Sequence, residues 1–168
     1  MKISAFALVV LLGTTAFAHE PETPKKADPA AFAYLKTLIG TWTSDGPNKT
    51  TYTYSEVSGG RCIKEHMDFG KGAGMDTVYC ADGEGVVATH YCDSGNQPRL
   101  KSKPFTAGDK ALSLDFLDAT GLASPNEGHM HALVVEKFAA DKATLTWSFF
   151  KDGKEQQKAV FNLVKKKG

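Results

Sequence analysis

From Trp42 onward the chain is a succession of short segments rich in Val, Thr, Tyr and Phe, separated by glycine-containing turns. Asp82-Gly83 and Asp152-Gly153 are dipeptides typical of tight β-hairpins. An open sheet built from so many antiparallel strands would leave exposed edges, and closure removes them. The sequence therefore predicts an all-β protein, an antiparallel meander β-barrel of about ten strands. The strands are expected near residues 41–45, 50–57, 61–69, 74–81, 84–93, 97–105, 111–117, 129–138, 143–150 and 156–165.

A short helix is expected between Pro29 and Ile39, ahead of the strands. Apolar side chains in this segment recur at the spacing of one helical face. Asp28 is a suitable N-cap with Pro29 at the first helical position, and Gly40 is a suitable stop. The helix would bury its apolar stripe, formed by Phe32, Leu35, Leu38 and Ile39.

The N-terminal 18 residues have the pattern of a secretory signal peptide. Lys2 is followed by an apolar run, and Ala16-Phe17-Ala18 is a suitable cleavage site. The run is too short to cross a bilayer as a helix. We therefore expect a signal peptide over 1–18, a proline-rich flexible leader over 19–29 and a barrel domain over 30–168. The mature protein would be periplasmic or secreted, without membrane insertion after signal cleavage.

The charge balance argues against a nucleic-acid partner. Without Lys2, the 20 basic residues become 19, equal in number to the 19 acidic residues. Binding to nucleic acid would require a basic excess on one face. We therefore expect no nucleic-acid partner, and the small-molecule partner that we expect instead rests on the polar residues described below.

The three cysteines can be examined through strand register. An exported protein lies in a compartment where disulfides persist. If Gly70-Lys71-Gly72 forms a turn, Cys62 lies directly opposite Cys80 on the neighbouring strand. The sequence predicts this disulfide and leaves Cys92 as the odd thiol.

The same reasoning indicates which side chains point inward. With Asp82-Gly83 as a two-residue turn, Met75 pairs with His90. The more apolar face of these strands then carries Glu65, His90 and Cys92. We therefore expect these three polar groups inside the barrel.

Two segments, 89–99 and 128–131, concentrate the chain's polar recognition groups. Arg99 is suited to a carboxylate or phosphate, because its guanidinium donates two parallel hydrogen bonds. The long polar loop 118–128 is expected to cap the barrel mouth. The length of the turn near 139–142 leaves open which face His129 and His131 share. The predicted ligand-binding residues are His90, Asn96, Gln97, Arg99, His129 and His131.

These residues favour an exported protein that binds a small, partly apolar ligand with an anionic or hydrogen-bonding group, without catalysis or a cofactor. Two alternatives stay open. The first is a metal- or redox-cofactor-binding protein that uses His90, Cys92, His129 and His131, a set that zinc or copper would accept. The second is a small barrel isomerase or hydrolase that uses His90 or Glu65.

The short helix, Gly40-Thr41-Trp42 and the many short strands resemble the lipocalin-type (calycin) barrels. That resemblance implies that Trp42 plugs the closed end. Together with Thr-His-Tyr-Cys at 89–92, Gly-Asn-Gln-Pro-Arg at 95–99 and Gly-His-Met-His at 128–131, the pattern resembles exported bacterial lipocalin-like proteins of unassigned function. Two features depart from related barrels. The final strand has no arginine to stack on the tryptophan, and no histidine follows His131, so haem binding is not implied.

Overall fold

The computed structural model describes residues 28–45, 49–70 and 73–167. The predicted signal peptide, and the predicted leader up to residue 27, lie outside the described residues. The described chain contains one α-helix, one short 3-10 turn (Ser58–Gly60) and ten strands. The elements are α1 (Ala30–Lys36), β1 (Gly40–Ser44), β2 (Thr51–Val57), β3 (Cys62–Gly70), β4 (Ala73–Asp82), β5 (Gly85–Tyr91), β6 (Gln97–Ser102), β7 (Ala111–Thr120), β8 (His129–Ala139), β9 (Lys142–Lys151) and β10 (Lys154–Lys165).

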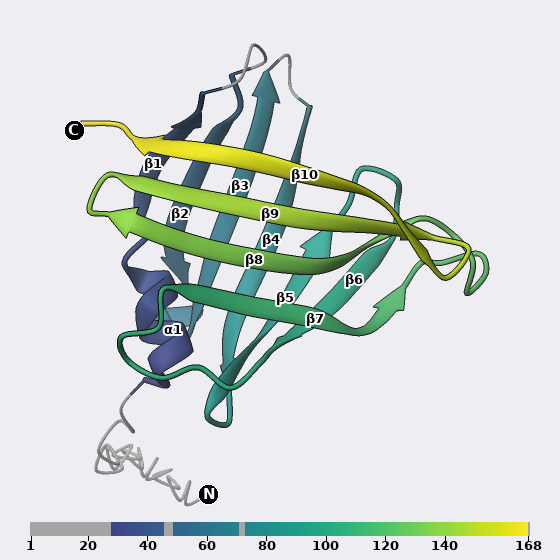
Figure 1. Cartoon of the computed structure of the whole chain (residues 1–168), viewed down its shortest axis with the longest axis horizontal. Helices are drawn as coiled ribbons and strands as arrows, with labels where there is room; N and C mark the ends of the chain where they lie inside the picture. Colours follow the sequence, from purple (N-terminus) through teal and green to yellow (C-terminus); the bar gives the residue numbers. More distant parts are fainter. Residues whose placement is uncertain (1–27, 46–48, 71–72, 168) are drawn as a thin grey trace, which may run out of the picture.

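The ten strands form one closed antiparallel barrel (Figure 1). Each strand pairs with its sequence neighbours, and β10 closes the barrel against β1. Apolar side chains from alternate positions fill the interior, as the two-residue period of a strand requires. The predicted all-β meander barrel of about ten strands is confirmed.

Helix α1 closes one end of the barrel (Figure 1). Phe32, Leu35 and Leu38 are at most 1% exposed and pack into the apolar interior. The indole Nε1 of Trp42 donates a hydrogen bond to the Leu38 carbonyl oxygen at 2.6 Å. Trp42 thus ties the segment after the helix to β1, and it lies where the resemblance places a plug.

The helix boundaries differ from the predicted ones. Asp28 is not the N-cap, because Pro29 occupies that position and the Asp28 carboxylate binds the Lys36 ammonium at 2.8 Å. The helix ends at Lys36, before the predicted stop. Gly40 is instead the first residue of β1, with a φ of 122° that favours glycine.

A lysine of the final strand lies beside Trp42. The Lys165 ammonium of β10 lies 5.1 Å from the centroid of the Trp42 ring, within the range of a cation–π contact. A Cβ at Gly40 would lie only 2.9 Å from Lys165 Cε. Glycine at this position therefore leaves room for the lysine to reach the indole.

The predicted disulfide is confirmed. Cys62 of β3 lies opposite Cys80 of β4, and their sulfurs are bonded at 2.07 Å. Cys92 carries a free thiol.

Replacing Cys62 and Cys80 together by Ala is expected to lower the free energy of unfolding by about 3 kcal/mol. The bond closes a loop with a sequence separation of 18, and opening it increases the entropy of the unfolded chain. Urea denaturation with and without a reductant measures the effect. The reductant should destabilise the wild type and leave the double variant unchanged. Equal stability of the oxidised wild type and the variant would contradict the prediction.

The predicted pairing of Met75 with His90 is wrong. Asp82 pairs with Gly85, so the two turn residues are Gly83 and Glu84. This shift by two residues places Thr77 opposite His90. A two-residue shift keeps every side chain on its predicted face, and His90 is indeed buried.

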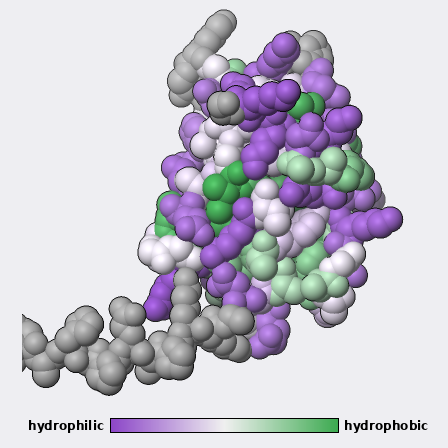
Figure 2. All heavy atoms as spheres, turned by 90° about the vertical axis from the view of Figure 1, so that its left-hand side faces the viewer, coloured by the Kyte–Doolittle hydropathy of each residue, from purple (hydrophilic) through white to green (hydrophobic). Residues whose placement is uncertain are grey.

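The surface at the α1 end is mostly hydrophilic, with small separate hydrophobic patches (Figure 2). Hydrophilic side chains are expected on the outside, because every second residue of a strand points away from the apolar interior. None of the helices in the described ranges is long and apolar enough to span a membrane.

Candidate ligand-binding pocket

A row of polar side chains crosses four neighbouring strands inside the barrel. Tyr54 on β2 lies opposite Glu65 on β3, Glu65 lies opposite Thr77 on β4, and Thr77 lies opposite His90 on β5. All four residues are at most 2% exposed. The apolar residues of the core surround this row.

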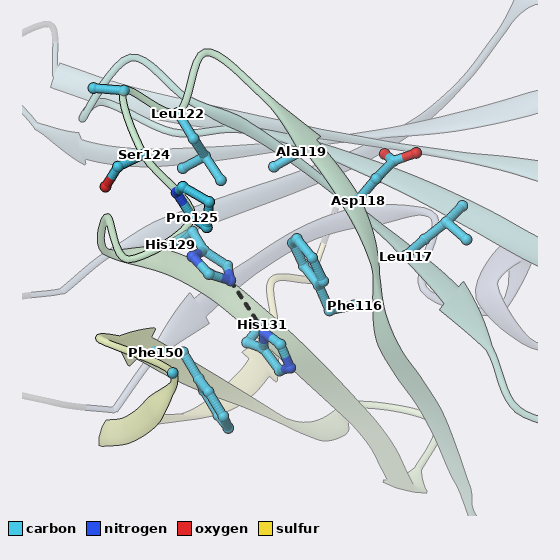
Figure 3. A pocket seen from close by; sticks show the side chains of 12 residues that line it. Phe116, Leu117, Asp118, Ala119, Leu122, Ser124, Pro125, His129, His131 and Phe150 are labelled. Atoms are coloured by element: carbon cyan, nitrogen blue, oxygen red, sulfur yellow. Dashed lines mark hydrogen bonds between the residues drawn. The ribbon is translucent and has the colours of Figure 1, made fainter.

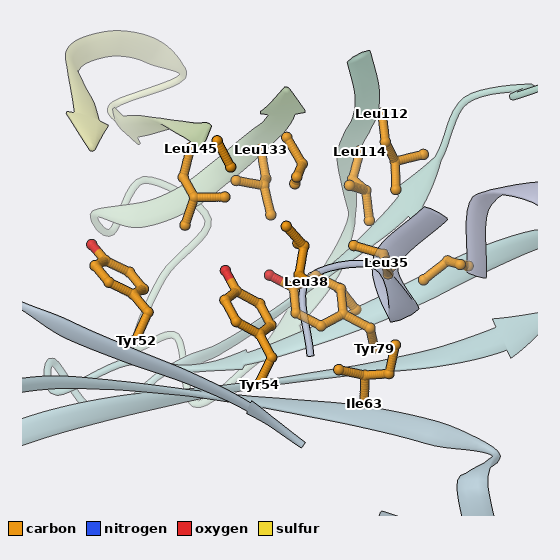
Figure 4. Packing of buried hydrophobic residues seen from close by; sticks show 14 of the residues in the cluster. Leu35, Leu38, Tyr52, Tyr54, Ile63, Tyr79, Leu112, Leu114, Leu133 and Leu145 are labelled. Carbon is orange, nitrogen blue, oxygen red and sulfur yellow. The ribbon is translucent and has the colours of Figure 1, made fainter. Parts of the chain in front are cut away.

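Glu65 is held in this row by a tyrosine hydroxyl. Tyr79 donates a hydrogen bond from its hydroxyl to Glu65 Oε2 at 2.8 Å, while Oε1 is buried without a partner. Three tyrosines, Tyr52, Tyr54 and Tyr79, point their hydroxyls into the interior (Figure 4). Burial raises the pKa of Glu65 to about 7. The carboxyl is therefore close to half protonated at neutral pH.

His90 is buried in the uncharged form. Its Nδ1 lies 2.9 Å from Thr77 Oγ1, and its ring packs 4.9 Å from the Trp147 ring. Burial lowers the pKa of His90 to about 4. Like Glu65, His90 is only 1% exposed. Ligand binding or catalysis by these two residues stays a prediction.

The barrel wall parts between β7 and β8. Their pairing ends at Asp115 and Ala132, although β7 continues to Thr120 and β8 begins at His129. A pocket of about 670 Å³ lies at this opening. It is lined by Phe116, Leu117, Asp118, Ala119, Leu122, Ala123, Ser124, Pro125, His129, His131, Phe150 and Gly153.

Strand register settles which face the two histidines occupy. His129 pairs with Phe150, three residues beyond the inward-facing Trp147. Because side chains alternate, Phe150 and His129 lie on the outer side of the sheet. An irregularity between Met130 and Ala132 follows, and His131 remains beside His129. Both histidines thus line the pocket, where their rings contact Phe116.

The two imidazoles form a hydrogen-bonded pair among aromatic rings (Figure 3). His129 Nε2 lies 3.1 Å from His131 Nδ1, and His129 Nδ1 lies 2.9 Å from the Glu127 carbonyl oxygen. The His131 ring stacks on Phe116 at 4.8 Å and on Phe150 at 3.9 Å between centroids. Burial lowers the pKa of His131, and the neighbouring His129 lowers it further. The pair is thus a polar group in a mainly apolar pocket.

The loop between β7 and β8 is fastened over the pocket by its neighbours. Asn96 donates from Nδ2 to the Gly128 carbonyl oxygen at 2.9 Å. The Asp152 amide donates to the Asn126 carbonyl oxygen at 3.0 Å. A Cβ at Gly128 would lie 2.3 Å from Phe149 Cζ, so the loop approaches that ring closely. The loop is thereby placed as a fixed wall of the pocket.

Three other predicted ligand-binding residues lie beside the pocket without lining it. Asn96 fastens the loop, and Gln97 bonds the Gly95 carbonyl oxygen at 2.7 Å and the Thr120 hydroxyl at 2.9 Å. Arg99 donates from Nε to Asp118 Oδ1 at 2.6 Å and from Nη2 to Oδ2. The guanidinium that was expected to meet an anionic ligand is therefore engaged by Asp118. Ligand binding by these three residues stays a prediction.

The alternative metal-binding set is not gathered at one point. Among the residues that the structure describes, no three His, Cys, Asp or Glu side chains could hold a metal ion together. Cys92 follows the last residue of β5, is half-buried, and accepts a hydrogen bond from the Ser94 hydroxyl at 3.1 Å. His90, Cys92, His129 and His131 therefore do not form a common site.

Several pocket residues were not identified from the sequence. Phe116 alternates with polar neighbours as a core residue does, and Phe150 lies in an apolar run. Neither pattern indicates a place where two strands part. The long polar loop was the usable signal, and Leu122 and Pro125 within it do line the pocket.

No protein-family model matches the sequence, and no curated protein is similar to it at a significant level. The architecture itself, a closed antiparallel ten-stranded barrel with a helix at one end, is consistent with a calycin-like barrel.

Proposed function

We propose that this protein is an exported lipocalin-like barrel that binds a small, flat, mainly apolar molecule without catalysing a reaction. The single observation that carries the proposal is the pocket of about 670 Å³ between β7 and β8. Pockets for small ligands have volumes of roughly 300–1,000 Å³ and combine apolar walls with few polar groups. The N-terminal signal pattern and the disulfide support export.

The shape of the ligand follows from the walls. The rings of Phe116 and Phe150 lie within 11° and 18° of the plane of the His131 ring. A further flat group can pack against the outer faces or edges of such a stack in an offset or edge-to-face arrangement. Leu122 and Pro125 of the loop add apolar contacts.

Prodan, a flat fluorescent naphthalene ketone, tests the pocket directly. We expect micromolar binding with a blue-shifted emission, and at least about tenfold weaker binding to the Leu122→Arg variant, because a charge then enters an apolar wall. Val160→Arg is the matched control, since Val160 is exposed on β10 and does not line the pocket. An equal loss of Prodan affinity in both variants, or no loss in either, would count against this pocket. Native mass spectrometry of protein purified from the periplasm would reveal a co-purified organic ligand.

A further inference from the structure

The hydrogen bonds of the imidazole pair have a defined direction. A carbonyl oxygen can only accept, so His129 must donate from Nδ1 to Glu127. With one proton on each ring, His129 Nε2 is then bare. His131 must therefore donate from Nδ1 across the 3.1 Å to that nitrogen. The remaining nitrogen of the pair, His131 Nε2, carries a lone pair and no proton.

The surroundings keep that lone pair available. Phe116 and Phe150 cover the two faces of the His131 ring and hold its orientation, while Nε2 lies on the ring edge directed away from His129 (Figure 3). Among the described residues, Nε2 has no hydrogen-bond partner. Burial also lowers the pKa of His131, which favours the neutral ring.

The carboxylate in the pocket lining, Asp118, already has hydrogen-bond donors. Both carboxylate oxygens of Asp118 accept hydrogen bonds from Arg99. Ser124, which also lines the pocket, is exposed to solvent. His131 Nε2 is therefore a free acceptor on a residue that lines the pocket.

We propose that His131 accepts a hydrogen bond through Nε2 from the ligand, so that the pocket selects flat aromatic molecules with a hydroxyl group over their methyl ethers. This inference rests on the proposed binding function and names the ligand class for the same site. The hydroxyl supplies the donor that an ether lacks, and the stacked rings supply the apolar contacts shared by both.

The paired ligands 2-naphthol and 2-methoxynaphthalene test the inference, with binding measured by calorimetry at pH 7.5. Wild-type protein should bind the naphthol about tenfold more tightly, since a buried hydrogen bond contributes about 1 kcal/mol and leaving it unmade costs more. His131→Phe keeps a stacking ring and should abolish the preference, so that the two ligands bind with an affinity ratio of about one. A second variant, His131→Gln, is tested in the same way. Thermal unfolding of both variants, compared with that of the wild type, shows whether either substitution causes a folding defect. Ser55→Ala removes an exposed hydroxyl outside the pocket lining and is the matched control, which should keep the full preference.

A second readout is independent of any ligand. Long-range ¹H–¹⁵N correlation spectra of the free protein should show His131 protonated at Nδ1 and bare at Nε2. The opposite tautomer would overturn the inference. Equal affinity of wild-type protein for the naphthol and its ether would also overturn it, while leaving the proposed binding function intact. Failure of both compounds to bind would instead overturn the pocket itself.

Discussion

Replacing Trp42 by Ala is expected to lower the free energy of unfolding by about 4 kcal/mol, the largest effect of any single change considered for this barrel. Trp42 is fully buried, and its indole joins three parts of the fold. It lies on β1, donates to the Leu38 carbonyl after the helix, and lies under the Lys165 ammonium of β10. Its removal leaves a cavity and an unpartnered carbonyl at the closed end. Urea denaturation followed by circular dichroism measures the loss.

Two milder variants separate the contributions to this effect. Trp42→Phe keeps most of the ring and removes the donor, and it should cost about half as much. Lys165→Met keeps the alkyl chain and removes the charge above the indole, which should cost about 1 kcal/mol or less. A loss below about 1 kcal/mol in Trp42→Ala would show that the tryptophan does not hold the helix end closed.

Replacing Glu65 by Gln is expected to raise the free energy of unfolding by about 3 kcal/mol at pH 8 and to leave it nearly unchanged at pH 4. The folded protein raises the pKa of Glu65 from an ordinary value of 4.5 to about 7. Between these values the folded state holds more protons than the unfolded state, so stability falls as the pH rises. Each pKa unit corresponds to about 1.4 kcal/mol. Gln is uncharged at every pH and avoids this loss.

His90 has the opposite pH dependence. Its pKa falls from an ordinary 6.5 to about 4 in the folded protein, so its contribution is complete above pH 6.5 and is lost as the pH falls toward 4. The slopes from His90 and Glu65 therefore oppose each other in the wild type between about pH 4.5 and 6.5. In that window, stability should rise with pH in Glu65→Gln and fall with pH in His90→Gln, relative to the wild type. Urea denaturation at intervals from pH 4 to pH 8 gives these slopes, and parallel curves for all three proteins would contradict the prediction.

Much of the barrel was predictable because local chemistry determines register. The alternation of apolar residues identified the inward face, and the pairing of Cys62 with Cys80 followed from one turn. The predicted turn at Asp82-Gly83 lies one residue later in the chain, at Gly83 and Glu84. That error changed the partner of His90 without changing its face.

The candidate site was less predictable because it depends on where regular pairing stops. His129 and His131 do line the pocket, and ligand binding by them stays a prediction. The side of the sheet that they occupy could not be predicted, because it depends on the irregularity that follows Met130. Arg99 looked like an anion-binding group, but Asp118 lies within reach across the β6–β7 pairing. Such a partner is visible only when the two strands are aligned.

The pocket at the opening between β7 and β8 uses few of the residues that fill the barrel core. The rows of side chains that fill the barrel interior come from every strand, whereas the wall of the pocket is built largely from one loop and the ends of two strands. If the pocket binds a ligand as proposed, substitutions at Leu122 or Pro125 should change ligand selectivity with little effect on the stability of the barrel, because neither residue belongs to the core. Variation in this one loop would then change specificity while the strands stay the same.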